Sequence, residues 1–345
     1  MKKVSFKRLF QYSVVIVLTL LICFCILLFK SHKSDKQNKY FFSRKLYKPN
    51  FVVQTNSIFD SLDTKGSKLF SYNCLIMKDN LSAYVDMCTL IDFKGNELKK
   101  VLIPEKCMTV VAYVDSCLFW IKNLELRCKN IQNGITKNIF FSNKVINAIP
   151  VGYNKFLIFG VNQSSGINRT IFSICCLKSD SLKCMENVNV CFTDIYKTFQ
   201  EKTLAYDGVF LRAFDYTTYS FYHIPYVYVF DNEGNFIRAI KTKDNVPFPS
   251  VIKYKDFYIL ERGKSYSSNI SSFIYKNIVC VFSYHSPTTG QITIDCYGLK
   301  DGEYKGSISV SNKKNIDNKM IDDVVSTSKY ILINSGGRVV TIGCL

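Results

Sequence analysis

The stretch that decides the fold is YVYVFDNEGNFIRAIKTKDNVPFPSV, residues 226–251. It opens by alternating valine with tyrosine and phenylalanine, which is typical of a strand buried on both faces. The turn-forming run Asp231–Asn235 follows, in which Asp and Asn side chains bond their own backbone and Gly234 tolerates a positive φ. Phe236–Ile240 then resumes an extended pattern, so the stretch predicts a β-hairpin. Two prolines near its end exclude continuation as a central strand, so we expect the chain to leave the sheet there.

The same hairpin pattern recurs along the chain. Residues 91–98 and 230–237 share an Asp-x-x-Gly-Asn-x-aliphatic core. Weaker matches to this pattern occupy residues 128–139, 176–185 and 297–308. Each consists of an expected strand, a polar turn and a second strand. Recurrence at intervals of roughly forty to seventy residues indicates a solenoid or a propeller, and in a propeller such hairpins form the outer strand pair of a four-stranded blade.

Length and composition agree with an all-β repeat protein. The 345 residues are 48% hydrophobic and 14% aromatic, which is enough to build a sizeable core. Extended runs dominate from Phe51 onward, and the best helical candidate is a short segment at 194–204. Residues 51–345 accommodate six blades of roughly 45–50 residues, whereas a single β-sandwich is usually smaller.

The Asp-x-x-Gly-Asn hairpins and the succession of strands resemble six-bladed β-propellers of the NHL and TolB-like type. The segment FDNEGNFIRAIKTKDNVPFPSVIKY is also similar to uncharacterised, membrane-anchored propeller-like proteins of the Bacteroidetes. The resemblance covers about residues 70–345 and is sharpest over 226–261. It implies blades and carries no catalytic residue onto this chain.

The N-terminal region predicts a membrane anchor. Residues 9–29, LFQYSVVIVLTLLICFCILLF, contain no charged side chain and are long enough to cross the hydrocarbon core as a helix. No small-residue cleavage site follows, which favours an uncleaved signal anchor over a signal peptide. A buried core helix and lipid attachment at Cys23 or Cys25 are the alternatives. We therefore expect a basic tail at 1–8, the transmembrane anchor at 9–29, a basic stalk at 30–50 and the propeller at 51–345.

Charge is concentrated next to the anchor. The net charge is +18, and residues 1–48 hold eleven Lys and Arg and one acid. This placement favours contact with phospholipid, and the chain lacks zinc-finger spacing or RNA-binding aromatic motifs, so no nucleic-acid partner is expected. The basic residues after the anchor slightly outnumber those before it, which by count favours a cytoplasmic domain. Short-tailed N-terminal anchors nevertheless usually export the large domain, and we expect an extracytoplasmic one.

Twelve cysteines follow the anchor, which in an exported domain favours some disulfides. Cys117 with Cys128, and Cys176 with Cys184, flank expected hairpins and are candidate cross-strand pairs. The alternative is that most cysteines are small buried apolar residues on strands. No C-x-x-C occurs, which disfavours a structural zinc site or a thioredoxin-type redox site.

No local catalytic motif is present. The chain lacks HExxH, G-x-S-x-G, Asp-x-Asp, a sialidase Asp box and a P-loop, since Tyr258 occupies the position of the first P-loop glycine before Gly263. The sequence therefore predicts no cofactor and no metal, and it favours a protein that is not an enzyme.

Several polar residues of the central third remain as site candidates, because propellers bind ligands where loops converge at the mouth of the central channel. We expect His223, Asp244 and Arg262 to help line this mouth. The structural alternative is that Asp244 caps a turn, Arg262 pairs with an acid and His223 lies among tyrosines. A wider set of polar residues in the same region comprises Asp207, Arg212 and Glu261.

The aromatic run FDYTTYSFYHIPYVYVF (214–230) fits inter-blade contacts better than a carbohydrate-stacking face. Altogether the sequence predicts a membrane-anchored, extracytoplasmic β-propeller that binds membrane lipid through 9–29 and an unknown protein, small molecule or glycan through its domain. The alternative is a propeller lyase, lactonase or glycosidase with a site assembled from loops at the channel mouth. A third interpretation is a disulfide-rich surface or envelope protein of a pathogen or virus.

Overall fold

The computed structural model describes the chain from Arg44 onward with gaps. The described residues are 44, 51–52, 64, 67–72, 74–79, 82, 84–162, 169–189, 195–285, 291–311, 316–327 and 330–344. Within them no helix is long and apolar enough to span a membrane. The predicted tail, anchor and most of the stalk lie outside the described residues, so the anchor stays a prediction.

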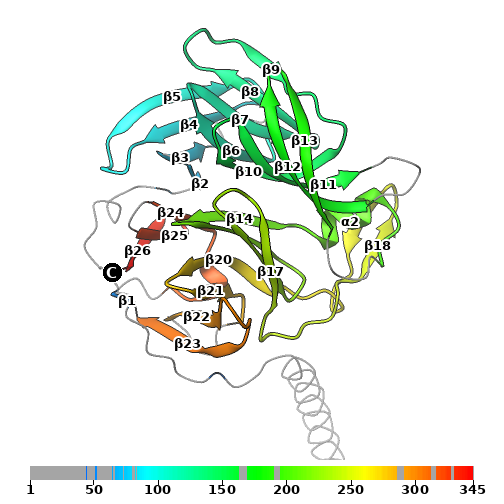
Figure 1. The fold of residues 1–345 in the computed structure, drawn as a ribbon, viewed down its shortest axis with the longest axis vertical. Helices are drawn as coiled ribbons and strands as arrows, with labels where there is room; N and C mark the ends of the chain where they lie inside the picture. The colour runs from blue at the N-terminus through cyan, green and yellow to red at the C-terminus, as the bar shows by residue number, and fades with distance from the viewer. Residues whose placement is uncertain are drawn as a thin grey trace, which may run out of the picture. The chain divides into compact units, whose positions relative to one another are not determined.

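The described chain forms six four-stranded antiparallel sheets, the blades of a β-propeller (Figure 1). The first blade comprises β2 Ser67–Tyr72, β3 Cys74–Asp79, β4 Asp86–Ile91 and β5 Glu97–Ile103. The second blade comprises β6 Thr109–Val114, β7 Cys117–Lys122, β8 Glu125–Asn130 and β9 Thr136–Asn138. The third blade comprises β10 Lys144–Gly152, β11 Lys155–Asn162, β12 Arg169–Lys178 and β13 Ser181–Asn189. The next two blades are β14 Gly208–Ala213, β15 Tyr216–Phe221, β16 Tyr226–Asp231 and β17 Phe236–Lys241; and β20 Asn269–Tyr275, β21 Ile278–Ser283, β22 Gln291–Gly298 and β23 Tyr304–Ser311.

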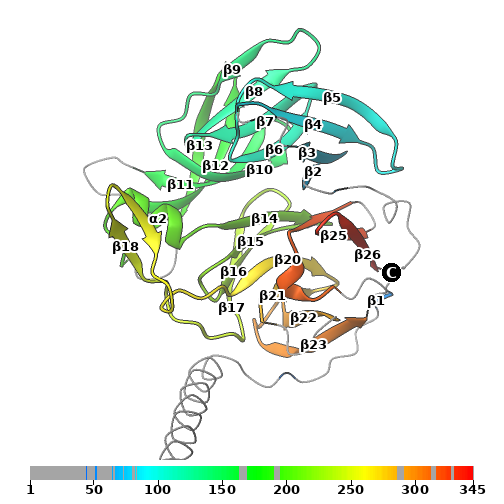
Figure 2. The same cartoon turned by 180° about the vertical axis from the view of Figure 1, so that it is seen from behind.

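Both ends of the described chain build the sixth blade. Its strands are β24 Asp323–Ser326, β25 Tyr330–Ser335, β26 Arg338–Cys344 and, as the outer strand, β1 Phe51–Val52. Phe51 pairs with Cys344 and Val52 with Gly343, so β1 lies beside the C-terminal strand, as Figures 1 and 2 both show. This pairing joins the first and last strands of the domain, and the six-bladed prediction is confirmed.

Six clusters of buried hydrophobic residues hold the ring together, one at each interface between neighbouring blades. The most aromatic one joins the third and fourth blades around Phe172, whose ring lies 4.5–6.0 Å from five other aromatic rings. Tyr219, Phe221, Tyr228 and Phe230 from the aromatic run of the sequence are all buried in this cluster. That run therefore serves inter-blade contacts.

The recurrent hairpins of the sequence are the outer strand pairs of five blades. In the Asp231 turn, the Oδ1 atom accepts from the backbone N–H groups of Glu233 and Asn235, and Gly234 has φ +90°. The turn at Asp92 in the first blade makes the equivalent bonds. The shared Asp-x-x-Gly-Asn core thus encodes one turn geometry that is used twice.

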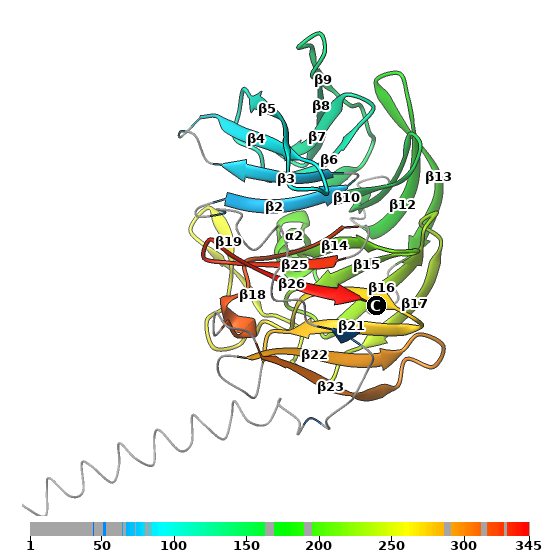
Figure 3. The same ribbon diagram turned by 90° about the vertical axis from the view of Figure 1, so that its left-hand side faces the viewer.

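Three elements of the described chain stand outside the blades. Helix α2, Phe199–Ala205, lies between the third and fourth blades and starts with a capping box formed by Thr198 and Glu201. The hairpin of β18 Val251–Tyr254 and β19 Phe257–Leu260 follows β17 and contacts α2 (Figures 1 and 3). The two prolines thus end the fourth blade as expected, but the chain forms this small sheet before it enters the next blade. A short 3₁₀ turn, η3 Asn318–Met320, precedes β24.

The predicted cysteine pairs are wrong. All ten cysteines whose side chains are described are free thiols, and most are buried. A two-residue turn with positive φ at Asn123 and Leu124 places Cys117 opposite Asn130 and Cys128 opposite Phe119. In the third blade Cys176 faces Lys183.

The register set by the turns, which the sequence did not reveal, thus keeps the thiols of each predicted pair apart. The alternative interpretation, small buried apolar residues on strands, describes these cysteines better.

Candidate functional site: the central cavity

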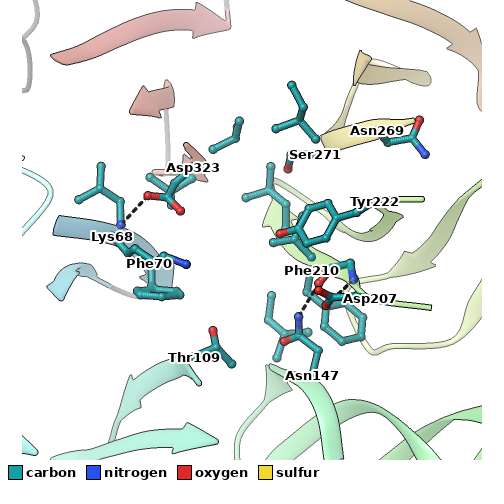
Figure 4. Close-up of a pocket in the computed structure, with 18 of the residues that line it drawn as sticks. Lys68, Phe70, Thr109, Asn147, Asp207, Phe210, Tyr222, Asn269, Ser271 and Asp323 are labelled. Atoms are coloured by element: carbon teal, nitrogen blue, oxygen red, sulfur yellow. Dashed lines mark hydrogen bonds between the residues drawn. The ribbon is translucent and has the colours of Figure 1, made fainter. Parts of the chain in front are cut away.

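A cavity of about 510 Å³ lies at the centre of the ring. Its walls are the innermost strands of all six blades, β2, β6, β10, β14, β20 and β24, together with residues that flank these strands. Apolar side chains such as Phe70 and Phe210 share the wall with polar ones (Figure 4). This volume lies in the range of pockets that hold small molecules.

Asp207 immediately precedes β14 and turns its carboxyl toward the cavity (Figure 4). Oδ1 accepts a hydrogen bond from the backbone N–H of Gly208 at 2.9 Å, and no other described group bonds the carboxyl. The side chain is exposed on its cavity side, yet protein encloses it elsewhere. That enclosure raises the pKa of Asp207 to about 6, which the Gly208 N–H and the Lys68 charge only partly oppose.

Asp323 begins β24 and reaches the cavity from the opposite side (Figure 4). Its Oδ2 accepts from the backbone N–H of Leu69 at 3.1 Å, and this hydrogen bond joins the last blade to the first. The same oxygen accepts from Nδ2 of Asn334 at 3.2 Å. Burial raises the pKa of Asp323, although these two donors and Lys68 lower it. Among the described residues no donor bonds Oδ1, so this oxygen is available to a ligand.

Lys68 and Tyr222 complete the polar groups between the two carboxyls. The Lys68 side chain is exposed and lies close enough to lower the pKa of both aspartates. Burial, with smaller contributions from Asp207 and Asp323, raises the pKa of Tyr222, so its hydroxyl stays protonated and able to donate. Neither side chain bonds another described residue.

Two further oxygens in the cavity wall lack a partner. Asn269 donates from Nδ2 to three backbone carbonyls, but its buried Oδ1 accepts nothing. The buried Ser271 hydroxyl also has no hydrogen bond. Buried polar groups are normally satisfied, so unpaired ones beside a cavity indicate a place for water or ligand.

The structure brings one of the three predicted site residues to this cavity. His223 follows β15 and lines the cavity. Its Nδ1 lies 3.3 Å from the carbonyl oxygen of Tyr266. Burial lowers the pKa of His223, so the ring is neutral at pH 7. Asp244 is buried in an ion pair with Arg44 and does not line the cavity. Arg262 is exposed and forms no hydrogen bond or ion pair with its side chain in the described part of the chain.

Of the wider set of polar residues, Asp207 and Arg212 line the cavity, and Arg212 donates to the carbonyl of Pro150 at 3.0 Å. Sequence reasoning did not single out Asp323, Lys68 or Tyr222. Their only sequence signal is a polar side chain at or next to the start or end of a strand.

The described residues contain no group of three or more His, Cys, Asp or Glu side chains arranged to hold a metal ion. The polar groups at the cavity include two carboxyl groups with raised pKa, the Lys68 ammonium group, the Tyr222 phenol and the His223 imidazole.

Comparisons with known proteins give only distant likenesses to solved structures. No family model and no curated protein matches the chain. Similar solved structures include a DUF4221-family protein from Bacteroides vulgatus, with 12% identity, coverage of 87% of this chain and 97% of that one, and a TM-score of 0.46. Others are Hsv2 from Kluyveromyces marxianus (9%, 79% and 69%, TM-score 0.42) and the β-propeller domain of Cps50 (Swd1) from Myceliophthora thermophila (9%, 86% and 100%, TM-score 0.40). Likenesses at this level carry no argument about ligand or activity, and the NHL and TolB-like assignment stays a prediction.

Proposed function

We propose that this protein is a ligand-binding module: an extracytoplasmic β-propeller, anchored through residues 9–29, that binds a small polar molecule in its central cavity. The propeller fold is consistent with a binding or scaffold module. One observation supports the cavity as the binding site. Lys68, Asp207, Tyr222 and Asp323 surround it, and their cavity-facing polar atoms bond no other described residue.

The ligand chemistry follows from the balance of donors and acceptors. Among the described residues that line the cavity, the acceptors without a partner include a carboxyl oxygen each of Asp207 and Asp323, and Lys68 is the only cation without a partner. A molecule rich in hydrogen-bond donors satisfies these acceptors. The mixed polar and apolar wall fits a hydroxylated ring, so we propose a polyol of about monosaccharide size.

Calorimetric titration with monosaccharides, inositols and small primary amines tests this proposal. We expect saturable binding of a polyol that Asp207→Asn and Asp323→Asn each weaken at least tenfold. Asp256→Asn, which changes an exposed carboxyl in the β18–β19 turn, is the matched control and should bind normally. Binding of an amine alone would contradict the polyol assignment, and no binding at millimolar concentrations would contradict the cavity as a ligand site.

A second candidate function is acid–base catalysis at the same cavity. It is favoured by two carboxyl groups with raised pKa on opposite walls, because such groups occur at catalytic sites and a carboxyl with a pKa of about 6 acts as a general acid near neutral pH. Chromogenic glycosides and lactones test this function. Turnover that Asp207→Asn abolishes would establish an enzyme, whereas binding without turnover would leave the module interpretation.

The anchored, extracytoplasmic location is supported by the sequence of residues 9–29 and tested in intact cells. A cysteine introduced by Asp256→Cys lies on an exposed turn. We expect a membrane-impermeant maleimide to label it without permeabilisation, and labelling only after permeabilisation would place the domain in the cytoplasm.

A further inference from the structure

A second cluster of buried polar side chains lies between the fourth and fifth blades, and its residues do not line the central cavity. Arg44 inserts its guanidinium there, and only 6% of its side-chain surface is exposed. Nε donates to Oδ1 of Asp295 at 2.9 Å, and Nη2 donates to Oδ1 of Asp244 at 2.9 Å. Nη2 also lies 3.0 Å from the Ser283 hydroxyl. Three side chains from two blades thus hold one guanidinium.

The three acceptors belong to the folded propeller. Asp244 lies in the loop after β17, Asp295 lies within β22, and Ser283 ends β21. Both carboxyls are 1% exposed. Hydroxyl groups support them, since Ser283 donates to Asp244 and Ser307 donates to Asp295. The site is therefore shaped by the blades, and the arginine enters it from a distant part of the chain.

The charge balance explains why a cation is needed. Two buried carboxylates at one site repel each other and are poorly solvated. Arg44 is the sole cation paired with either of them in the described part of the chain. Burial and the neighbouring Asp295 still raise the pKa of Asp244 to about 6 against the opposing effect of Arg44. Removal of the arginine would leave this negative charge uncompensated.

The hydrogen-bond geometry selects a guanidinium over an ammonium. Asp295 accepts from two nitrogens of the guanidinium, since Nη2 lies 3.1 Å from its Oδ2 in addition to the Nε bond to its Oδ1. The same Nη2 lies 3.0 Å from Oδ2 of Asp244 and so contacts both carboxylates. A planar fork of N–H groups bridges the two carboxylates, whereas an ammonium is a single point donor on a flexible stem.

We propose that Asp244, Asp295 and Ser283 form a guanidinium-binding site, occupied in cis by Arg44, that binds a free alkylguanidinium when Arg44 is removed. Occupation of the site fastens the chain at Arg44 to the fourth and fifth blades. This attachment is separate from the β1–β26 pairing on the sixth blade.

Thermal unfolding of Arg44→Ala with and without n-propylguanidinium, the fragment that the substitution deletes, tests the proposal. We expect the variant to unfold about 10 °C below the wild type, since loss of Arg44 leaves two buried carboxylates without a compensating positive charge. Millimolar n-propylguanidinium should restore part of this loss saturably, and n-propylammonium at equal ionic strength should not.

Arg262→Ala removes an exposed arginine and is the matched control, with an unchanged midpoint and no response to either cation. Equal responses of both variants to n-propylguanidinium, or wild-type stability of Arg44→Ala, would overturn the proposal. If Arg44→Ala is recovered only unfolded, its refolding yield with each cation provides the same comparison. A triple variant that adds Asp244→Asn and Asp295→Asn should fold without either cation and should not respond to them.

Discussion

Replacement of Asp207 by asparagine should stabilise the protein at neutral pH while it removes a ligand-binding group. Asparagine keeps the acceptor for the Gly208 N–H but carries no charge to desolvate. The pKa of Asp207 is about 6 in the folded protein, against an ordinary value of 3.8. The full difference corresponds to about 3 kcal/mol at 1.4 kcal/mol for each pH unit. Because the side chain is exposed to the cavity, screening reduces this value and we expect about 1 kcal/mol.

The sign of the pH dependence follows from proton binding. Between about pH 4 and pH 6 folded Asp207 holds a proton that the unfolded chain has released, so the free energy of unfolding falls as the pH rises through this window. This decrease in the free energy of unfolding is complete once the pH is well above 6. Asp207→Asn lacks this contribution. The variant and the wild type should therefore be equally stable near pH 3.5 and differ by about 1 kcal/mol at pH 7.5.

Urea unfolding of both proteins at several pH values measures this difference. Other buried carboxyls with raised pKa, Asp244 and Asp323, affect both proteins alike and cancel in the comparison. Asp256→Asn, on an exposed turn, controls for the loss of a surface charge. A wild-type-to-variant difference that does not change between pH 3.5 and pH 7.5 would refute the raised pKa of this carboxyl.

Three further outcomes are expected. Thr198→Ala removes the capping box of α2 and should lower the free energy of unfolding by about 1 kcal/mol in urea titrations; an unchanged stability would show that the cap contributes nothing. Gly234→Ala places a Cβ at φ +90°, 3.2 Å from a valine methyl, and should cost about 1–2 kcal/mol or more by the same assay, so a neutral substitution would contradict the turn geometry. Maleimide labelling followed by mass spectrometry should find half-buried Cys184 modified before Cys74 and Cys128, since burial raises the pKa of the latter two thiols to about 11; the reverse order would contradict their burial.

The sequence predicts the blades because their hairpins depend on local chemistry. The Asp92 and Asp231 turns bind backbone N–H groups two and four residues ahead, so their geometry is contained in five consecutive residues. The alternation of valine with aromatic residues in β16 likewise reports burial on both faces. The six-blade prediction rested on such local patterns and on length.

The cavity residues could not be predicted in the same way. Asp323 and Leu69 are joined by a hydrogen bond only because the last blade closes against the first. Asp207 stands before a strand as many surface acids do, and its raised pKa arises from distant chain segments around it. Cysteine pairing failed for a related reason, since one two-residue turn decided which side chains face each other across β7 and β8. The cavity residues and the cysteine partners thus depend on closure of the ring and on strand register, neither of which can be predicted from local sequence patterns.

The pairing of β1 with β26 also sets the order of events during synthesis. The ribosome releases β1 before the strands of the first blade and β26 after all the other described strands. Strand β1 therefore has no partner strand while the rest of the domain emerges. Local hairpins form early, but contacts of such large sequence separation form slowly. The hydrophobic cluster between the sixth and first blades is therefore exposed until β24, β25 and β26 have left the ribosome. A ribosome that stalls before β24 leaves a chain whose central cavity lacks one wall and whose two terminal blades offer open apolar faces to other molecules.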